Sequence, residues 1–310
     1  MRSRNEPGGI HLFDRGTGLH ILIDEVKPRP EEWARVPRFL SIALTNACEL
    51  DCPYCFAPKH GARLQYNSIM RWLEEFDDEG GLGVGFGGGE PTLYPRFAEL
   101  CREIAIGTQL SVSFTTHGHW SKANLGEQLR GRVNFIRLSM DGMYATYEKF
   151  RGRSFQEFVL SLSRVRDTSR FGINFVVNDE TVNHLGQAAD FAMENGALEF
   201  LLLPEIPTAR RSGPSPSTKA KFEDWVQQNW SYYPLRTSAI SASQFDIPTA
   251  QAEDGRFAMD FVHIDAAGVL KSCAFDVSGV SLNQIPTVTE ALAVLTDAQL
   301  TTTRSTGGIP

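Results

Sequence analysis

Three cysteines within eight residues carry the strongest chemical signal in the chain. Cys48, Cys52 and Cys55 follow the pattern C-x3-C-x2-C inside the turn-prone segment TNACELDCPYCFAPKH. Thiolates are soft ligands that suit an iron–sulfur cluster or zinc, and three of them in one loop can converge on one metal group. A four-iron cluster held by only three cysteines keeps one iron open to a substrate.

A structural zinc site is the alternative interpretation of these cysteines. Closed zinc sites take four protein ligands, so His60 or another histidine would have to complete the set. Burial of the cysteines without any metal is a further possibility. The spacing alone leaves both metals open, because tetrahedral sulfur sites accept either.

Short apolar runs that alternate with amphipathic stretches are the elements that would position the cysteine loop. The expected strands cover residues 39–45, 82–88, 110–116, 135–140, 173–178 and 198–204. The expected helices cover residues 66–76, 95–106, 122–130, 155–166 and 184–194, and Gly196 suits the left-handed residue that ends the last one. This order predicts an α/β fold with a parallel sheet, whose chemistry lies at the carboxyl ends of the strands.

Composition narrows the class of protein. The chain has 310 residues, 42% hydrophobic content, a formal charge of −7 and no long block of Lys or Arg, so we expect a globular protein that does not bind nucleic acid. No apolar run approaches the roughly 20 residues that span a membrane, and the first residues lack a secretory signal. Clustered cysteines do not form a disulfide framework. We therefore expect a cytoplasmic protein without a membrane segment.

The cysteine spacing, with Tyr54 just before the last cysteine, resembles the signature of the radical S-adenosylmethionine (SAM) superfamily. The resemblance continues through the six β/α units, roughly residues 38–205, and implies a partial (β/α)6 TIM-like barrel. It implies that Cys48, Cys52 and Cys55 bind one 4Fe-4S cluster and that Tyr54 lies at the cofactor.

The ends of the second and third expected strands carry further parts of this pattern. Gly88, Gly89 and Glu90 resemble the GGE motif, which implies binding of the SAM amino group. Glycines let backbone carbonyls approach a small ammonium group closely, and a carboxylate balances its charge. Thr116, in the segment TTHG, resembles a TxNG turn and implies a cofactor contact, with His117 in a lining role where Asn is commoner.

The later strand ends complete the resemblance. Ser139 opens the segment SMDG, which resembles S-x-D-G and implies a contact to the ribose or carboxylate of SAM. Arg151 resembles the Arg of an R-G pair that binds the methionine carboxylate. The resemblance also implies that Asn178 contacts the ribose and that Leu203 flanks the adenine. The structural alternatives are a helix cap for Asp141, a solvated charge for Arg151, and core packing or turn formation for Asn178 and Leu203.

The resemblance implies a definite reaction. An electron from the reduced cluster cleaves the sulfur–5′-carbon bond of SAM, and the 5′-deoxyadenosyl radical then abstracts hydrogen from a substrate C–H bond. A flavodoxin- or ferredoxin-type protein would supply the electron.

The end of the chain, residues 257–310, shows a hairpin pattern and a final helix pattern over residues 287–300. It resembles the start of a SPASM or twitch extension, but Cys273 is its only cysteine, so we expect an extension without an auxiliary cluster. Cys273 is a candidate hydrogen donor to a product radical, whereas Cys101 is expected to be buried. The expected segments are therefore a strand-like lid at 1–37, the core at 38–205, a loop and amphipathic helix at 206–256, and this extension at 257–310.

SPASM-like members mostly modify ribosomally made peptides or proteins, so modification of a peptide or protein is the first expected function. A radical SAM enzyme acting on an amino acid, sugar or nucleotide is the second. A non-catalytic zinc protein is the alternative from another class.

Overall fold

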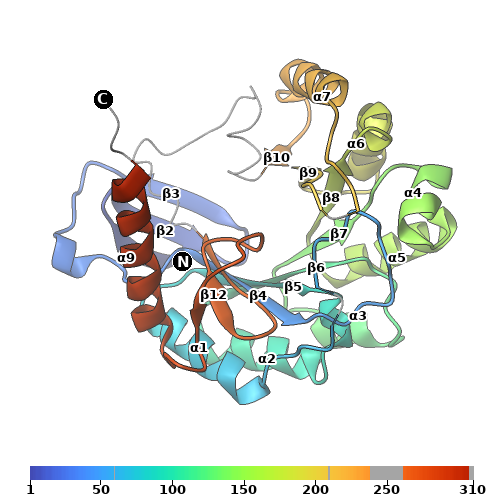
Figure 1. The fold of residues 1–310 in the computed structure, drawn as a ribbon. Coiled ribbons are helices and arrows are strands. Elements are labelled where there is room, and N and C mark those ends of the chain that lie inside the picture. Colours follow the sequence, from blue (N-terminus) through green and yellow to red (C-terminus); the bar gives the residue numbers. More distant parts are fainter. Residues whose placement is uncertain (59, 209, 238–260, 307–310) are drawn as a thin grey trace. The chain divides into compact units, whose positions relative to one another are not determined.

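The computed structural model describes residues 1–58, 60–208, 210–237 and 261–306, with side chains described as far as residue 297 (Figure 1). The chain forms two compact units, each assembled from segments that are distant in sequence. The first unit takes residues 1–47, 59–113 and 254–310, and the second takes residues 48–58 and 114–253. The cysteine loop therefore belongs to the second unit, and the chain passes from one unit to the other within β6, Ser111–Thr116.

Strands and helices alternate along the chain as the sequence predicts. The strands of this series besides β6 are β4 (Phe39–Thr45), β5 (Gly83–Gly88), β7 (Phe135–Ser139), β8 (Phe171–Val177) and β9 (Phe200–Pro204). The helices are α1 (Tyr66–Asp78), α2 (Phe97–Gly107), α3 (Leu125–Leu129), α4 (Tyr144–Arg151), α5 (Phe155–Thr168), α6 (Leu185–Glu194) and α7 (Pro216–Asn229). Short 3-10 turns are η1 (Pro30–Glu32), η2 (Pro91–Leu93) and η3 (Thr181–His184). The α/β class is confirmed.

In the first unit, β4 lies between β5 and β11 (Phe261–Ile264), and both pairings are parallel. One face of this sheet is apolar: Leu40 pairs in register with Val84 and Val262, and all three are buried. The buried residues of α1 and α2, such as Trp72 and Phe97, belong to the same unit. The strand end of β5 is thereby held beside that of β4.

The opening residues form a separate three-stranded antiparallel sheet in the order β1 (Arg2–Glu6), β2 (Gly9–Asp14) and β3 (Leu19–Ile23). The ring of Phe13 meets that of Phe39 edge to face, with centroids 5.9 Å apart. Glu6 is buried and pairs with Arg4 and Arg38. The expected strand character of this segment is confirmed, while its role as a lid stays a prediction.

In the second unit, β7, β8, β9 and β10 (Leu235–Thr237) pair in parallel in that order. One face is fully buried, with Leu138, Ile173 and Phe175 among its residues, and α4, α5 and α6 lie on one side of these strands (Figure 1). The opposite face carries Ser139 and Leu203, which are only partly buried.

The C-terminal hairpin is present as predicted. β11 pairs antiparallel with β12 (Val269–Lys271), Gly268 takes a φ of 80° in the turn, and β13 (Val280–Ser281) follows. Helix α9 (Val288–Thr306) begins where the Glu75 carboxylate of α1 accepts hydrogen bonds from the Val288 and Thr289 amides, at 2.8 and 2.9 Å.

Within the expected loop and amphipathic helix at 206–256, α7 begins at Pro216, because Ser215 caps it by accepting from the Thr218 amide and proline fits the first helical turn. Helix α4 was not expected at all. The part of the predicted segments over residues 238–260 lies outside the described residues.

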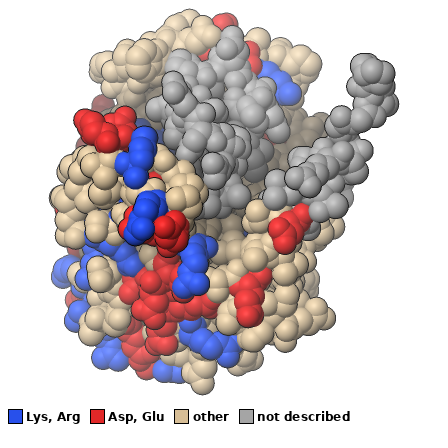
Figure 2. Space-filling view, turned by 90° about the vertical axis from the view of Figure 1, so that its left-hand side faces the viewer, with Lys and Arg blue, Asp and Glu red and all other residues tan. Residues whose placement is uncertain are grey.

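Figure 2 shows one face of the molecule on which acidic and basic side chains lie intermixed, so the described part of this face carries no continuous basic surface. Among the described residues, none of the helices has the length and apolar character needed to cross a membrane.

Candidate cofactor site

The cysteine loop presents its sulfur atoms to hydrogen-bond donors. All five cysteines of the chain are free thiols; within the loop Cys52 is buried and Cys48 and Cys55 are partly buried. The Leu50 amide donates to Sγ of Cys48 over 3.5 Å, and the Cys55 amide closes a turn onto the Cys52 carbonyl at 3.1 Å. N–H groups directed at sulfur stabilise thiolates, the form that binds metal. Three thiols in one loop, with an amide donor at Cys48, fit an iron–sulfur cluster.

A buried charge network holds the middle of this loop. The Tyr54 hydroxyl donates to Asp141, and Arg151 forms an ion pair with the same carboxylate oxygen. Arg151 also donates from Nη1 to Sγ of Cys52 over 3.7 Å. Burial raises the pKa of Tyr54 well above its usual value, so this phenol stays protonated and acts as a donor. The network ties the loop to the segment after β7 and to the end of α4.

Asp141 has a different role from the helix cap considered as its alternative. It is fully buried, and its second oxygen accepts from the Val176 amide of β8 at 2.9 Å. Helix α4 has Met143 at its N-cap and lacks a side-chain cap hydrogen bond. Asp141 therefore anchors the cysteine loop to β8, and sequence reasoning missed this because its partners are remote in sequence.

His117 and Glu49 form a second link to the loop. Nδ1 of His117 accepts the His119 amide at 3.0 Å, so the proton of the neutral ring lies on Nε2, which is 3.1 Å from Oε2 of Glu49. Ligand atoms of Cys48, Glu49 and His117 lie within 4.8 Å of one another. A metal on Nε2 would need the proton on Nδ1, where an amide N–H already points. The arrangement thus favours a hydrogen bond over zinc at His117.

The glycine-rich loop belongs to the first unit and is built on the residues that precede Cys48 in the chain. The Gly89 and Glu90 amides donate to the carbonyls of Thr45 and Ala47, at 2.7 and 2.8 Å. A Cβ on Gly88 would overlap the Thr45 carbonyl oxygen, and one on Gly89 would overlap that of Ala47. Side chains are excluded at both positions, which explains the glycines without reference to a ligand.

The Glu90 carboxylate is 1% exposed and caps η2. Its Oε1 accepts the Thr92 amide at 3.2 Å and the Thr92 hydroxyl at 2.6 Å. These bonds fix the rotamer of Glu90. Its predicted contact with the SAM amino group stays a prediction.

Thr116 and Asn178 each organise a turn at the end of their strand. The Thr116 hydroxyl oxygen accepts from the Gly118 amide at 3.0 Å and from Nε1 of Trp120 at 3.1 Å. Asn178 donates from Nδ2 to the buried Glu205 at 2.9 Å, and its Oδ1 accepts two amides of the η3 turn. Their cofactor contacts stay predictions, and Asn178 already serves the turn-forming role considered as its alternative.

Ser139 and Leu203 lie on the same face of the second unit's sheet. Ser139 pairs in register with Asn174, and Asn174 pairs with Leu201, two residues before Leu203. Asn174 is 7% exposed, and its Oδ1 has no hydrogen-bond partner among the described residues. A buried acceptor without a donor favours a bound group that carries an N–H or O–H. Sequence reasoning passed over Asn174 because it lies inside an apolar run.

Cys273 lies in the first unit, after β12. Its thiol donates to Oδ1 of Asp276 over 3.3 Å, and its amide donates to Oδ2 at 3.0 Å. Burial, together with this neighbouring carboxylate, raises the pKa of the thiol. A protonated thiol retains the hydrogen that the predicted donor role requires, and that role stays a prediction. Cys101 is fully buried on α2, as expected.

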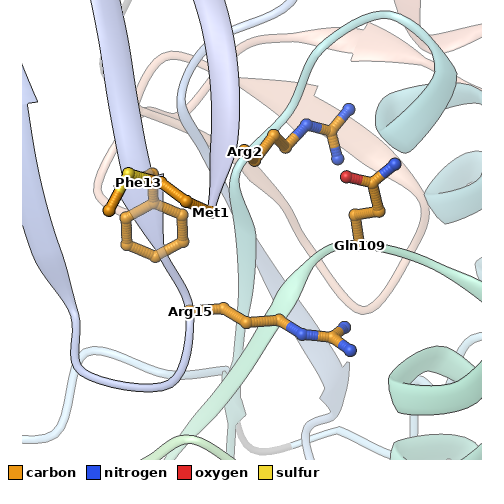
Figure 3. Close-up of a pocket in the computed structure, with 5 residues that line it drawn as sticks. All are labelled: Met1, Arg2, Phe13, Arg15 and Gln109. Atoms are coloured by element: carbon orange, nitrogen blue, oxygen red, sulfur yellow. The ribbon is translucent and has the colours of Figure 1, made fainter.

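A small pocket of about 200 Å³ also lies in the first unit, lined by Met1, Arg2, Phe13, Arg15 and Gln109 (Figure 3). Both arginines have partners within the protein: Arg2 pairs with Asp77, and Arg15 donates to the Thr108 carbonyl at 2.9 Å. None of the predicted site residues lines this pocket.

Comparisons with known proteins agree with the sequence pattern. Residues 42–192 match the model of the Radical SAM superfamily. The AdoMet-dependent heme synthase of Methanosarcina barkeri is 26% identical over 213 residues, which cover 66% of this chain and 60% of that protein. The sporulation killing factor maturation protein SkfB of Bacillus subtilis is 25% identical over 202 residues, 62% of this chain and 48% of SkfB. The chain thus spans less than two thirds of either relative.

The crystal structure of Streptococcus suis SuiB bound to S-adenosylmethionine superposes with a TM-score of 0.69, covering 91% of this chain and 84% of that chain at 15% identity. This likeness shows the fold, a partial TIM-like barrel with a C-terminal extension. The family match favours an iron–sulfur enzyme over the alternative of a non-catalytic zinc protein. Residues 42–192 thus form a domain of the radical SAM superfamily, whose members are enzymes that use a 4Fe-4S cluster and S-adenosylmethionine.

Proposed function

We propose that this protein is a radical SAM enzyme that binds one 4Fe-4S cluster through Cys48, Cys52 and Cys55 and modifies a peptide or protein. The observation that carries the cluster assignment is the buried Tyr54–Asp141–Arg151 network, which holds the cysteine loop and points an N–H donor at Cys52. When bound, the cluster supplies the electron that cleaves SAM to a 5′-deoxyadenosyl radical, which abstracts hydrogen from a substrate C–H bond.

The residues of this chain would then bind and orient SAM. Glu90 and the backbone of Gly88 and Gly89 bind its amino group. Arg151 binds its carboxylate: Nε of Arg151 is buried and has no hydrogen-bond partner among the described residues, so a carboxylate oxygen would satisfy it.

The remaining predicted contacts concern the nucleoside and the cluster loop. Ser139 contacts the ribose or the carboxylate of SAM, Thr116 contacts the cofactor, Asn178 contacts the ribose, and Leu203 flanks the adenine. Tyr54 takes the role of a donor that holds Asp141 in place beside Arg151.

A peptide or protein substrate is supported by two similar proteins. SuiB has been solved bound to the precursor peptide SuiA, and SkfB is named as a maturation protein of the sporulation killing factor. The heme synthase relative favours the second candidate, an enzyme acting on a small molecule. A short precursor peptide encoded beside this gene would separate the two, and deuterium transfer from a labelled candidate substrate into 5′-deoxyadenosine would locate the bond.

We also propose a flavodoxin- or ferredoxin-type protein as the source of the electron, and a cytoplasmic location, where thiols such as the five free cysteines stay reduced.

The direct test is formation of 5′-deoxyadenosine. We expect about four irons per chain after anaerobic reconstitution and 5′-deoxyadenosine from SAM and dithionite. Cys55→Ala should lose the product, whereas Cys101→Ala, which removes a buried cysteine on α2, should keep it. Product formation by Cys55→Ala at the wild-type level would overturn the assignment.

A further inference from the structure

Arg151 connects a predicted cluster ligand to a buried counter-ion. It is the last residue of α4, and its side chain is 11% exposed. Nη1 donates to Sγ of Cys52 over 3.7 Å, while Nη2 pairs with Oδ2 of Asp141. The positive charge therefore lies against the sulfur of one specific cysteine of the loop.

The Arg151 guanidinium stays charged, and its position is fixed by its partners. Burial by itself disfavours the charged guanidinium, but the combined attraction to Asp141 and to the neighbouring Tyr54, Cys52 and Tyr147 outweighs it and raises the pKa of Arg151 well above its usual value. Asp141 is fully buried and is fixed in turn by the Tyr54 hydroxyl and the Val176 amide. Because the Arg151 side chain is only 11% exposed, water screens its field at Cys52 weakly.

We propose that Arg151 is a positioning residue that raises the reduction potential of the cluster through Cys52, and that Asp141 moderates this effect. The inference rests on the proposed function, because it takes Cys52 as a cluster ligand. One-electron reduction adds negative charge to the cluster and its thiolates. A donor and a cation at Cys52 stabilise that reduced state, whereas a nearby carboxylate destabilises it.

The test is the midpoint potential of the reconstituted cluster, measured without SAM by dithionite titration followed by electron paramagnetic resonance. Arg151→Met removes the donor and the charge, so its potential should shift to a more negative value than wild type. Asp141→Asn keeps the cation but removes the counter-ion, so its potential should shift to a more positive value. Because SAM is absent, loss of a SAM contact by Arg151 does not enter the measurement.

Two further variants separate an electrostatic role from a structural one. Arg151→Lys keeps the charge and should restore most of the potential lost in Arg151→Met. Arg137→Met is the matched control, since Arg137 lies in the same unit and pairs with Glu199 at 2.7 Å, and its potential should equal that of wild type.

Equal potentials for wild type, Arg151→Met and Asp141→Asn, each at full iron content, would overturn the inference and leave the proposed function intact. A shift of both variants in the same direction would also overturn it. If Arg151→Met does not retain iron, Asp141→Asn and Arg151→Lys decide: a more positive potential in the first and a near-wild-type potential in the second support the inference. Full iron content in Cys52→Ala would instead refute the cluster assignment itself.

Discussion

His117 donates from Nε2 to the carboxylate of Glu49 over 3.1 Å, and Glu49 directly follows Cys48 in the chain. His117 is 4% exposed, and its tautomer is set by the His119 amide. The pair holds the start of the cysteine loop against the turn after β6. We expect the pair to position Cys48.

The first prediction concerns this pair. His117→Ala removes the buried donor to Glu49, and because water can reach this exposed carboxylate the loop should lose only about 0.5–1.5 kcal/mol of stability. We expect fewer iron and sulfide ions per chain after identical anaerobic reconstitution, and partial recovery in His117→Gln. His184→Ala is the control, since His184 bonds Thr146 on a different turn. Full iron content in His117→Ala would contradict the positioning role.

The second prediction concerns Glu90. Glu90→Gln keeps the size of the side chain and an oxygen for Thr92 but removes the charge opposite the SAM ammonium. We expect SAM to bind at least about tenfold more weakly, which is ~1.4 kcal/mol, at unchanged iron content. Equilibrium dialysis with labelled SAM measures this affinity.

Thr92→Val serves as the control for Glu90→Gln. It removes the hydroxyl donor to Oε1 but keeps the carboxylate charge. Thr92→Val should therefore lose less affinity for SAM than Glu90→Gln does. Equal affinities for wild type and Glu90→Gln would show that Glu90 only caps η2.

The sequence determined the repeated β/α order well, because each core strand is a short apolar run bounded by glycine or polar residues. The expected strand at 39–45 coincides with β4, and the glycine expected to end the fifth helix takes a φ of 86° at Gly196. The spacing of apolar residues shows which residues are buried. This prediction holds whichever element of the fold covers them.

The site residues were harder to predict from the sequence where they contact residues far away in the chain. Tyr54 and Asp141 are 87 positions apart, so no local pattern could pair them. Helix α4 was missed because its segment YATYEKFR is short and buries only Tyr147 and Phe150. Asn174 appeared to be one polar residue within an apolar strand, and only the register of β7 and β8 places it beside Ser139.

The third prediction contrasts Gly89, in the loop after β5, with Gly87, inside β5. A Cβ on Gly89 would overlap the Ala47 carbonyl, whereas one on Gly87 meets nothing within 4 Å. Gly89→Ala should therefore lower the free energy of unfolding by roughly 2 kcal/mol and weaken SAM binding, because the loop that carries Glu90 must shift. Gly87→Ala should change neither. Urea unfolding and SAM dialysis on both variants make the comparison, and equal behaviour would contradict it.

The fourth prediction is a pH dependence that arises from His263 of β11. Its ring is 7% exposed, with Nδ1 3.0 Å from the Ser41 hydroxyl, and burial lowers its pKa from 6.5 to about 4. Between these values the unfolded chain binds a proton that the folded chain does not. The contribution of His263 to stability is therefore complete above pH 6.5 and is lost as the pH falls toward 4.

At pH 5.5 the loss amounts to about 1.4 kcal/mol relative to pH 7.5. His263→Gln cannot titrate, so acidification should lower the free energy of unfolding of wild type by that much more than it lowers that of the variant. Anaerobic urea unfolding of the cluster-loaded proteins at the two pH values measures the difference, and acid effects on the cluster cancel between wild type and variant. His60→Gln, which removes an exposed histidine, should behave like wild type. A constant difference between wild type and His263→Gln at both pH values would show that His263 is not held neutral in the fold.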